Sequence, residues 1–306
     1  MAEPSARPEL DARRAALAVL FAFLTPALLV YASFTVYPVL RTFYNAFHAI
    51  KPQGVVEFVG VANFANLLFA DAVFWKAVTN TALFTVVATI VDVVGGLLLA
   101  LCLFATAPVA RFFRVVWFTP VLMSYVVVGI LWVWIFDYDW GLANATLRWL
   151  GLGAFEQSWL GHPSTALWSV LVAHEWKWLG FNMIVFLAAL HALPAEVLGA
   201  AELDNCGWFA KLVYVIAPML RATIVNLLVL SFIGKMMVFD LVWVMTGGGP
   251  LWSSETVSTY VYKRAFEWNT FDLGYPSAIA VLWFLIILGF VAIMTRWLRR
   301  RDKLEF

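Results

Sequence analysis

The 306-residue chain is too apolar for a soluble globular protein, because 63% of its residues are hydrophobic, only 13% are charged and its mean hydropathy is +0.87. This composition indicates an integral membrane protein. The net charge of +1 gives no basis for a nucleic-acid partner, and Cys102 and Cys206 lie at no metal-binding or redox spacing.

Six apolar stretches follow a polar start, residues 1–14, which we expect to be a cytoplasmic tail. Each stretch can cross a bilayer core, which takes roughly 20 residues. The first is also too long for the apolar region of a cleavable signal peptide. The sequence therefore predicts an all-α membrane protein with a six-helix transmembrane domain over residues 15–297 and a cytoplasmic tail over 298–306. The predicted spans are 15–40, 78–104, 115–136, 166–192, 219–245 and 277–297.

The distribution of positive charge predicts the orientation. If the N-terminus lies inside the cell, Lys and Arg are twice as frequent on inner segments as on outer ones. In membrane proteins, short cytoplasmic loops contain more Lys and Arg than short loops on the outer side. Both termini and the loop 193–220 are therefore expected in the cytoplasm.

Several ionisable residues lie well inside the predicted spans, namely Asp92, Glu175, Lys177 and Lys235. Each costs roughly 2.5–3.5 kcal/mol at the centre of a membrane helix on insertion scales, so each should face the bundle interior, a partner or a water-filled cavity. Mutual pairing and a polar layer along a translocation path both explain them. Our candidates for a substrate path are Asp92, Lys177, Trp178, Asn182, Lys235 and Asp240.

The loop 193–220 interrupts the apolar pattern between the fourth and fifth spans. Pro194 is expected to end one helix, and Glu196 falls in the first turn of the next, where negative charge suits the helix dipole. Asp204 and Asn205 can end that short helix, since both side chains compete for backbone hydrogen bonds and Asn tolerates the left-handed conformation. The loop should thus hold a short helix, a turn and a second short helix. An ordinary polar loop is the alternative.

The residue order of this loop resembles the cytoplasmic signature loop of binding-protein-dependent ABC importer permeases. That family has Glu-Ala-Ala, two residues, Asp-Gly and then a Pro near the next membrane helix. Ala200, Ala201 and Asp204 match, whereas Gly199 and Asn205 replace the family's Glu and Gly. The resemblance implies a coupling helix that fits a cleft of an ATPase subunit. The implied contact residues are Glu196, Gly199, Ala200, Ala201, Glu202, Asp204, Asn205 and Gly207.

A second motif, TGGGP at residues 246–250, marks a turn when taken alone, and no Lys-Ser or Lys-Thr follows it to make a phosphate cradle. With residues 37–38, 80–81 and 180–183, it resembles the carbohydrate-importer branch that includes maltose-type and glycerol-phosphate-type permeases. The resemblance implies a type I ABC importer permease fold in a bacterial or archaeal inner membrane. It also implies a second permease subunit, a homodimeric ATPase, and an extracytoplasmic solute-binding protein that delivers a sugar or polyol.

Two other classes of function remain to be compared with this one. An ion-coupled secondary transporter could use Asp92 or Glu175. Inverted repeats would support that function, and the sequence shows no convincing repeat. A membrane-embedded enzyme would need a clustered nucleophile and base. Because the sequence contains no Walker motif, catalytic triad or metal-ligand cluster, we expect no enzymatic activity, metal or cofactor on this chain, with ATP and Mg²⁺ on the ATPase.

Overall fold

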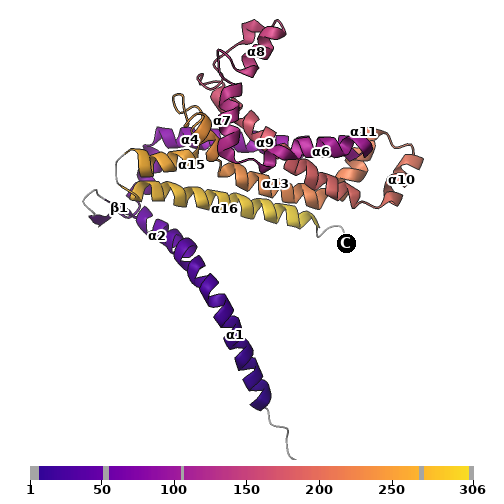
Figure 1. The fold of residues 1–306 in the computed structure, drawn as a ribbon. Helices are drawn as coiled ribbons and strands as arrows, with labels where there is room; N and C mark the ends of the chain where they lie inside the picture. The colour runs from indigo at the N-terminus through magenta and orange to yellow at the C-terminus, as the bar shows by residue number, and fades with distance from the viewer. Residues whose placement is uncertain (1–6, 51–54, 105–106, 269–271, 303–306) are drawn as a thin grey trace, which may run out of the picture.

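The computed structural model describes residues 7–50, 55–104, 107–268 and 272–302, and these are mostly helical (Figure 1). Within them, three helices are long and apolar enough to cross a membrane: Val19–Ala46, Ala72–Phe104 and Gly274–Arg296. Three further pairs of helices pass the same test, each bent by more than 40°. The expected six spans are reached if each bent pair is one span.

The first helical run stands apart from the rest of the molecule. It comprises α1 (Arg7–Tyr31), a π-helical turn (Ala32–Val36) and α2 (Tyr37–Ala46), so it is helical through part of the expected N-terminal tail. No residue of its most apolar window is buried against the rest of the chain, and Figure 1 shows α1 projecting away from the other helices. An antiparallel hairpin and a short helix follow, formed by β1 (His48–Ile50), β2 (Val56–Phe58) and α3 (Ala62–Phe69).

The second span is longer than the sequence predicted. It begins with α4 (Ala72–Ile90), because the Asp71 carboxylate accepts a hydrogen bond from the Phe74 amide at 2.9 Å and so caps the helix. A π-helical turn (Val91–Gly95) then leads into α5 (Gly96–Phe104). This turn contains Asp92, and such wide turns occur often at functional sites.

The third predicted span, residues 115–136, is wrong as a continuous helix. α6 (Ala107–Leu122) and α7 (Tyr125–Ile135) meet at 105°. The Ser124 hydroxyl accepts a hydrogen bond from the Val127 amide at 3.3 Å and caps a new helix in the middle of the apolar run. The following outer segment contains α8 (Leu142–Trp149) and a 3-10 turn (Gly153–Phe155).

The fourth span, α9 (Ala166–His191), matches its predicted range of 166–192 closely and lies at the centre of the bundle. A Cβ at Gly180 would lie 1.9 Å from the carbonyl oxygen of Trp117, so α9 approaches the backbone of α6 very closely. On the other side, Gly96 of α5 meets Asn182 in the same way. The helix also packs against α4, α7, α13 and α14.

The fifth predicted span, residues 219–245, is also broken. Three residues separate α13 (Arg221–Met236) from α14 (Asp240–Met245). The Thr256 hydroxyl donates a hydrogen bond to the Val238 carbonyl at 3.1 Å, so a later loop binds the exposed backbone of this break. The elements that precede α13 are α10 (Ala195–Leu203), α11 (Trp208–Lys211), a π-helical turn (Leu212–Ile216) and α12 (Ala217–Met219).

The chain ends with α15 (Val257–Tyr262), a π-helical turn (Lys263–Glu267) and the long α16 (Gly274–Asp302). α16 covers the predicted sixth span and continues into the expected C-terminal tail. Apolar clusters join α4, α7, α9 and α14 in one region, and α5, α9 and α13 in another. α10 and α11 lie at one end of the bundle, and the β1 hairpin lies at the opposite end (Figure 1).

Candidate functional site

The turn that ends α10 has the hydrogen bonds of a Schellman motif. The Cys206 amide donates to the Ala201 carbonyl at 3.0 Å, and the Asn205 amide donates to the Glu202 carbonyl at 3.1 Å. Asn205 has a φ of +50°, the left-handed conformation that this position requires. Asn therefore takes the position of the Gly expected from the resemblance, since it is the residue that best tolerates this conformation after Gly. The predicted helix and turn are confirmed.

The side chains of α10 differ in what they offer to another protein. Ala200 is exposed, whereas Ala201 is only 8% exposed and packs within the chain. The expectation that both alanines admit an approaching surface therefore holds for Ala200 only. Gly199 lies beside open space, because a Cβ there would have no neighbour within 4 Å. Glu196 lies exposed in the first turn, as predicted.

An ion pair joins α10 to α11. The Lys211 amine donates to the Glu202 carboxylate at 2.6 Å, and this hydrogen bond with the lysine charge lowers the pKa of Glu202. Gly207 precedes the first residue of α11, which begins just beyond the turn. Glu202 is thus engaged within the loop, while the carboxylate of Glu196 faces outward.

A cavity of about 330 Å³ lies between α9, α13 and the π-helical turn of the second span. Four of the six predicted substrate-path residues line it: Asp92, Trp178, Asn182 and Lys235. Its other lining residues are Tyr125, His174, Phe181, Leu230, Ser231 and Gly234.

Asp92 and Lys235 form a buried ion pair beside this cavity, at 1% and 4% exposure. The Ser231 hydroxyl also donates to Asp92 Oδ2, at 3.1 Å. A second buried contact joins His174 Nδ1 and Glu175 Oε1 at 3.0 Å. The sequence left mutual pairing and a place along a polar path as alternatives. In the structure, Asp92 and Lys235 pair with each other and also line the cavity.

Lys177 lies outside the cavity lining and contacts the break between α6 and α7. Its Nζ donates to three backbone carbonyl oxygens, those of Pro120 at 3.2 Å, Val121 at 3.0 Å and Met123 at 2.5 Å. The last carbonyl groups of a helix lack partners within the helix, and a cation suits its negative end. Lys177 therefore caps α6 from a different helix.

The remaining candidate, Asp240, is exposed at the start of α14 and lies outside the cavity lining. Sequence reasoning missed Tyr125 and Ser231. The Tyr125 hydroxyl accepts a hydrogen bond from Trp178 Nε1 at 2.8 Å, which fixes the indole at the cavity wall. For Ser231, a single hydroxyl within an apolar run was the available signal.

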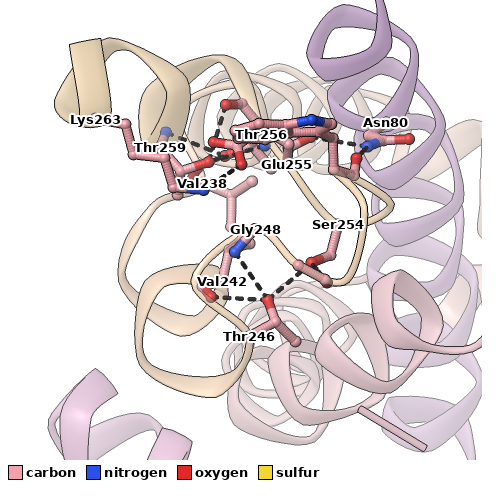
Figure 2. A network of polar contacts seen from close by, with 12 residues as sticks. Asn80, Val238, Val242, Thr246, Gly248, Ser254, Glu255, Thr256, Thr259 and Lys263 are labelled. Atoms are coloured by element: carbon pink, nitrogen blue, oxygen red, sulfur yellow. Dashed lines mark hydrogen bonds and ion pairs between the residues drawn. The ribbon is translucent and has the colours of Figure 1, made fainter. Parts of the chain in front are cut away.

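A second buried polar cluster, the outer network, surrounds the TGGGP loop (Figure 2). Glu255 and Lys263 form its ion pair at 2.5 Å. Burial raises the pKa of the Glu255 carboxyl, and the hydrogen bond and charge of Lys263 oppose that shift. From α4, the Asn80 amide donates to the carbonyl oxygens of Trp252 and Glu255, both at 2.9 Å. The loop is thereby bound to the second span.

The Thr246 hydroxyl organises the lower part of the outer network. It donates to the Val242 carbonyl at 3.0 Å and accepts from the Gly248 amide at 3.2 Å and the Ser254 hydroxyl at 2.8 Å, as Figure 2 shows. Gly248 has a φ of +82°. Specific hydrogen bonds to Thr246 therefore hold the glycine-rich segment in place. Its composition alone predicts only a turn.

Comparisons with known proteins identify similar chains. Residues 92–303 match the family described as binding-protein-dependent transport system inner membrane component. The sulfoquinovosyl glycerol transport system permease protein SmoG of Agrobacterium fabrum is 31% identical, over 94% of this chain and 91% of that protein. The trehalose/maltose transport system permease protein MalF of Thermococcus litoralis is 30% identical, over 92% and 94%.

The fold is shared with a solved structure. A chain of a bacterial alginate ABC transporter, in complex with an alginate pentasaccharide-bound periplasmic protein, superposes with a TM-score of 0.82 at 23% identity. The match covers 96% of this chain and 97% of that one. The family match spans both the cavity and the loop that contains α10 and α11. The chain belongs to the family of inner membrane components of binding-protein-dependent transport systems.

Proposed function

We propose that this chain forms one half of the translocation path of an ATP-binding cassette importer for a sugar or related polyol. The observation that carries the proposal is the family match over residues 92–303, which includes the cavity and the loop 193–220, called the coupling loop from here on. The named relatives include permeases of trehalose/maltose, lactose and arabinooligosaccharide transport systems. These names support a carbohydrate as the transported class.

The coupling loop is the surface for the ATPase. The Schellman turn and the ion pair between Glu202 and Lys211 hold α10 and α11 in a fixed relation. Gly199, Ala200 and Glu196 lie on the accessible part of α10. In this proposal a homodimeric ATPase binds ATP and Mg²⁺, and this chain contributes no catalytic residue, metal or cofactor site.

The connections of the loop explain how movement of the ATPase reaches the cavity. α10 directly follows α9, which places Trp178 and Asn182 at the cavity wall. α11 and α12 lead into α13, which places Ser231 and Lys235 on the opposite side. A displacement of the loop therefore acts on both helices at once, as alternating access requires.

The other partners are a second permease subunit, which completes the path, and an extracytoplasmic solute-binding protein. The periplasmic protein in the alginate transporter complex supports the latter. We place the chain in a bacterial or archaeal inner membrane with both termini in the cytoplasm, on the basis of its Lys and Arg distribution.

The test is ATP hydrolysis by the assembled complex, measured with mono-, di- and oligosaccharides, glycerol phosphates and the cognate binding protein. We expect at least one carbohydrate to stimulate hydrolysis and to be taken up by proteoliposomes. A flat response to every carbohydrate would contradict the substrate class. Uptake by this chain without the ATPase would contradict the importer mechanism and favour ion coupling.

A further inference from the structure

Two buried carboxyl groups lie against each other inside the bundle. Asp92 belongs to the π-helical turn of the second span, and Glu175 belongs to α9. Their side chains are hydrogen-bonded to each other. An ionised carboxylate contains acceptors only, so two ionised carboxylates cannot form such a bond. One of the two groups must therefore carry a proton.

Each carboxyl also has one oxygen atom that lacks a conventional hydrogen-bond donor among the residues that the structure describes. These atoms are Asp92 Oδ1 and Glu175 Oε2, and both are buried. Because neither atom is accessible, a water or ligand in the cavity does not reach them. Nearly all buried polar atoms in folded proteins are hydrogen-bonded. A proton held between the two carboxyl groups supplies the missing interaction.

The neighbours of the pair assign the proton to Glu175. Asp92 Oδ2 accepts hydrogen bonds from the Lys235 amine and the Ser231 hydroxyl, and both bonds favour its ionised form. Glu175 Oε1 contacts His174 Nδ1 at 3.0 Å. A neutral acid accepts at this oxygen atom from the imidazole N–H, and it donates from its other oxygen atom. Glu175 is thus the donor of the carboxyl pair and Asp92 is the acceptor.

The charges of the cluster agree with one bound proton. With Glu175 neutral, the charges of Asp92 and Lys235 cancel. The alternative is an imidazolium at His174 with both carboxyl groups ionised. That arrangement leaves the bond between the carboxyl groups without its proton. Burial of His174 and the nearby charges of Lys235 and Lys177 also oppose a further cation at this position.

The more distant titratable groups on the helices packed against α9 are engaged elsewhere. The Tyr125 hydroxyl of α7 accepts a hydrogen bond from the Trp178 indole. Lys177 binds the carbonyl groups at the end of α6, and Asp240 of α14 is exposed. The titratable groups that face Glu175 come from the second span, α13 and α9 itself, and they are Asp92, Lys235 and His174.

We propose that the bundle binds one structural proton, shared between Glu175 and Asp92, which joins α9 to the second span and, through Lys235, to α13. The proton is a fixed part of this closed cluster and is not transported. Its loss would place two negative charges in contact where the low dielectric strengthens their repulsion. Alkaline pH should therefore weaken the contact between the helices that form the cavity walls.

Infrared spectroscopy of the complete transporter in lipid detects this proton directly. Ordinary Asp and Glu side chains are ionised at neutral pH, because their pKa values lie near about 4. We expect the wild type to show a carboxylic acid C=O band that Glu175→Gln loses. Gln is neutral, and it keeps an acceptor for His174 and an N–H donor for Asp92, so this variant should assemble. Glu156→Gln removes a carboxylate paired with Arg148 in the outer segment, and as the matched control it should keep the band.

Isotope labelling gives the same assignment without a substitution. If Glu175→Gln fails to assemble, the wild type is prepared with glutamate that contains carbon-13 in its side-chain carboxyl group. The heavier carbon shifts the band if the proton is on a glutamate, as we expect. A band that the label leaves in place would assign the proton to an aspartate and contradict the assignment to Glu175.

The pH dependence of stability is the second measurement. An unfolded chain releases the Glu175 proton above about pH 4.3, whereas the folded chain keeps it. The free energy of unfolding therefore falls as the pH rises, until the folded chain also releases the proton. Buried glutamic acids can keep their proton up to about pH 8–9. Between neutral pH and that point, the melting temperature of the wild type should fall by roughly 2 °C per pH unit more than that of Glu175→Gln, which has no proton to lose.

The outcomes separate this inference from the proposed function. The absence of a carboxylic acid band in the wild type at neutral pH, a band that survives in Glu175→Gln, or equal pH dependence of the two proteins would overturn the inference. ATP-driven uptake that a protonophore abolishes would show that the proton moves, which would overturn the inference and favour ion coupling. Failure to take up any carbohydrate, with the band and the pH dependence as expected, would contradict the proposed function and leave the inference standing.

Discussion

Two buried ion pairs in this protein have opposite surroundings. In the outer network, Glu255 and Lys263 are eight residues apart in the sequence and are packed directly beneath the backbone of Gly248. In the bundle, Asp92 and Lys235 are 143 residues apart and face a cavity. The first pair fixes the shape of one loop. The second joins two spans and leaves room for a ligand, so burial of charge alone does not identify a substrate site.

Gly248→Ala should have the largest effect, because it fills the tightly packed network. The new Cβ would lie 2.0 Å from Glu255 Oε2, and the alanine would have to adopt a φ of +82°, which is unfavourable for a residue with a Cβ. We expect a loss of about 5 kcal/mol or more in stability, measured as thermal unfolding in detergent beside the amount of protein in the membrane. Gly247→Ala is the matched control, since its φ is also positive, +57°, but its Cβ would meet no atom within 4 Å. Equal stability of the two variants would show that packing against Glu255 is unimportant.

The pair that faces the cavity should show strong coupling. Asp92→Asn and Lys235→Met each leave a buried group without its partner, which costs about 3–5 kcal/mol, and the double variant should recover part of this loss. A double-mutant cycle of thermal stability measures the coupling, with uptake measured in parallel. Additive losses in the cycle would rule out the direct pair.

Lys177→Met should have an intermediate effect, since it leaves the carbonyl groups of Pro120, Val121 and Met123, at the end of α6, without their common donor. We expect a stability loss of about 1–3 kcal/mol and a smaller loss for Lys177→Arg, which keeps the positive charge. Uptake at varied ligand concentration provides the second measurement. A lower maximal rate with unchanged half-saturation fits a role at the break, whereas a raised half-saturation with normal stability would restore Lys177 as a ligand contact.

Gly199→Glu should have the smallest effect, because its Cβ has open space and Glu is a better helix former than Gly. The change also restores the family residue. We expect the free energy of unfolding to stay within about 0.5 kcal/mol of the wild type and the transport rate to be unchanged. Ala201→Trp is the contrasting variant, since Ala201 packs within the loop, and it should abolish transport. Full uptake by Ala201→Trp, or loss of uptake in Gly199→Glu, would reject the assignment of this loop to coupling.

The sequence was sufficient for the class of fold and for the helix and turn in the coupling loop. Apolar length predicts where the spans lie, and Asn205 indicates where α10 ends, because both are local properties of the chain. The breaks after Leu122 and Met236 were missed, since apolar residues continue through both. The exposed carbonyl groups at these breaks accept hydrogen bonds from residues distant in the sequence, Lys177 and Thr256.

The candidate site was predictable to a similar extent. Four of six expected path residues meet at one cavity, because polar groups in a membrane helix must turn inward. Their inward orientation was therefore readable from their position in each span. The partner of each group was not readable, since Lys177 and Lys235 both lie inside apolar spans, yet Lys177 binds backbone carbonyl groups and Lys235 binds a carboxylate.

The contact of Lys177 with the break after α6 also bears on how the chain enters the membrane. Lys177 lies 54 to 57 residues after the carbonyl groups that it binds. At about 5–20 residues per second, the ribosome needs several seconds to reach it after the break has been synthesised. During that interval the carbonyl groups must be hydrated or held by the insertion machinery. The two halves of this bent span therefore reach their final angle only after a later helix has been inserted beside them.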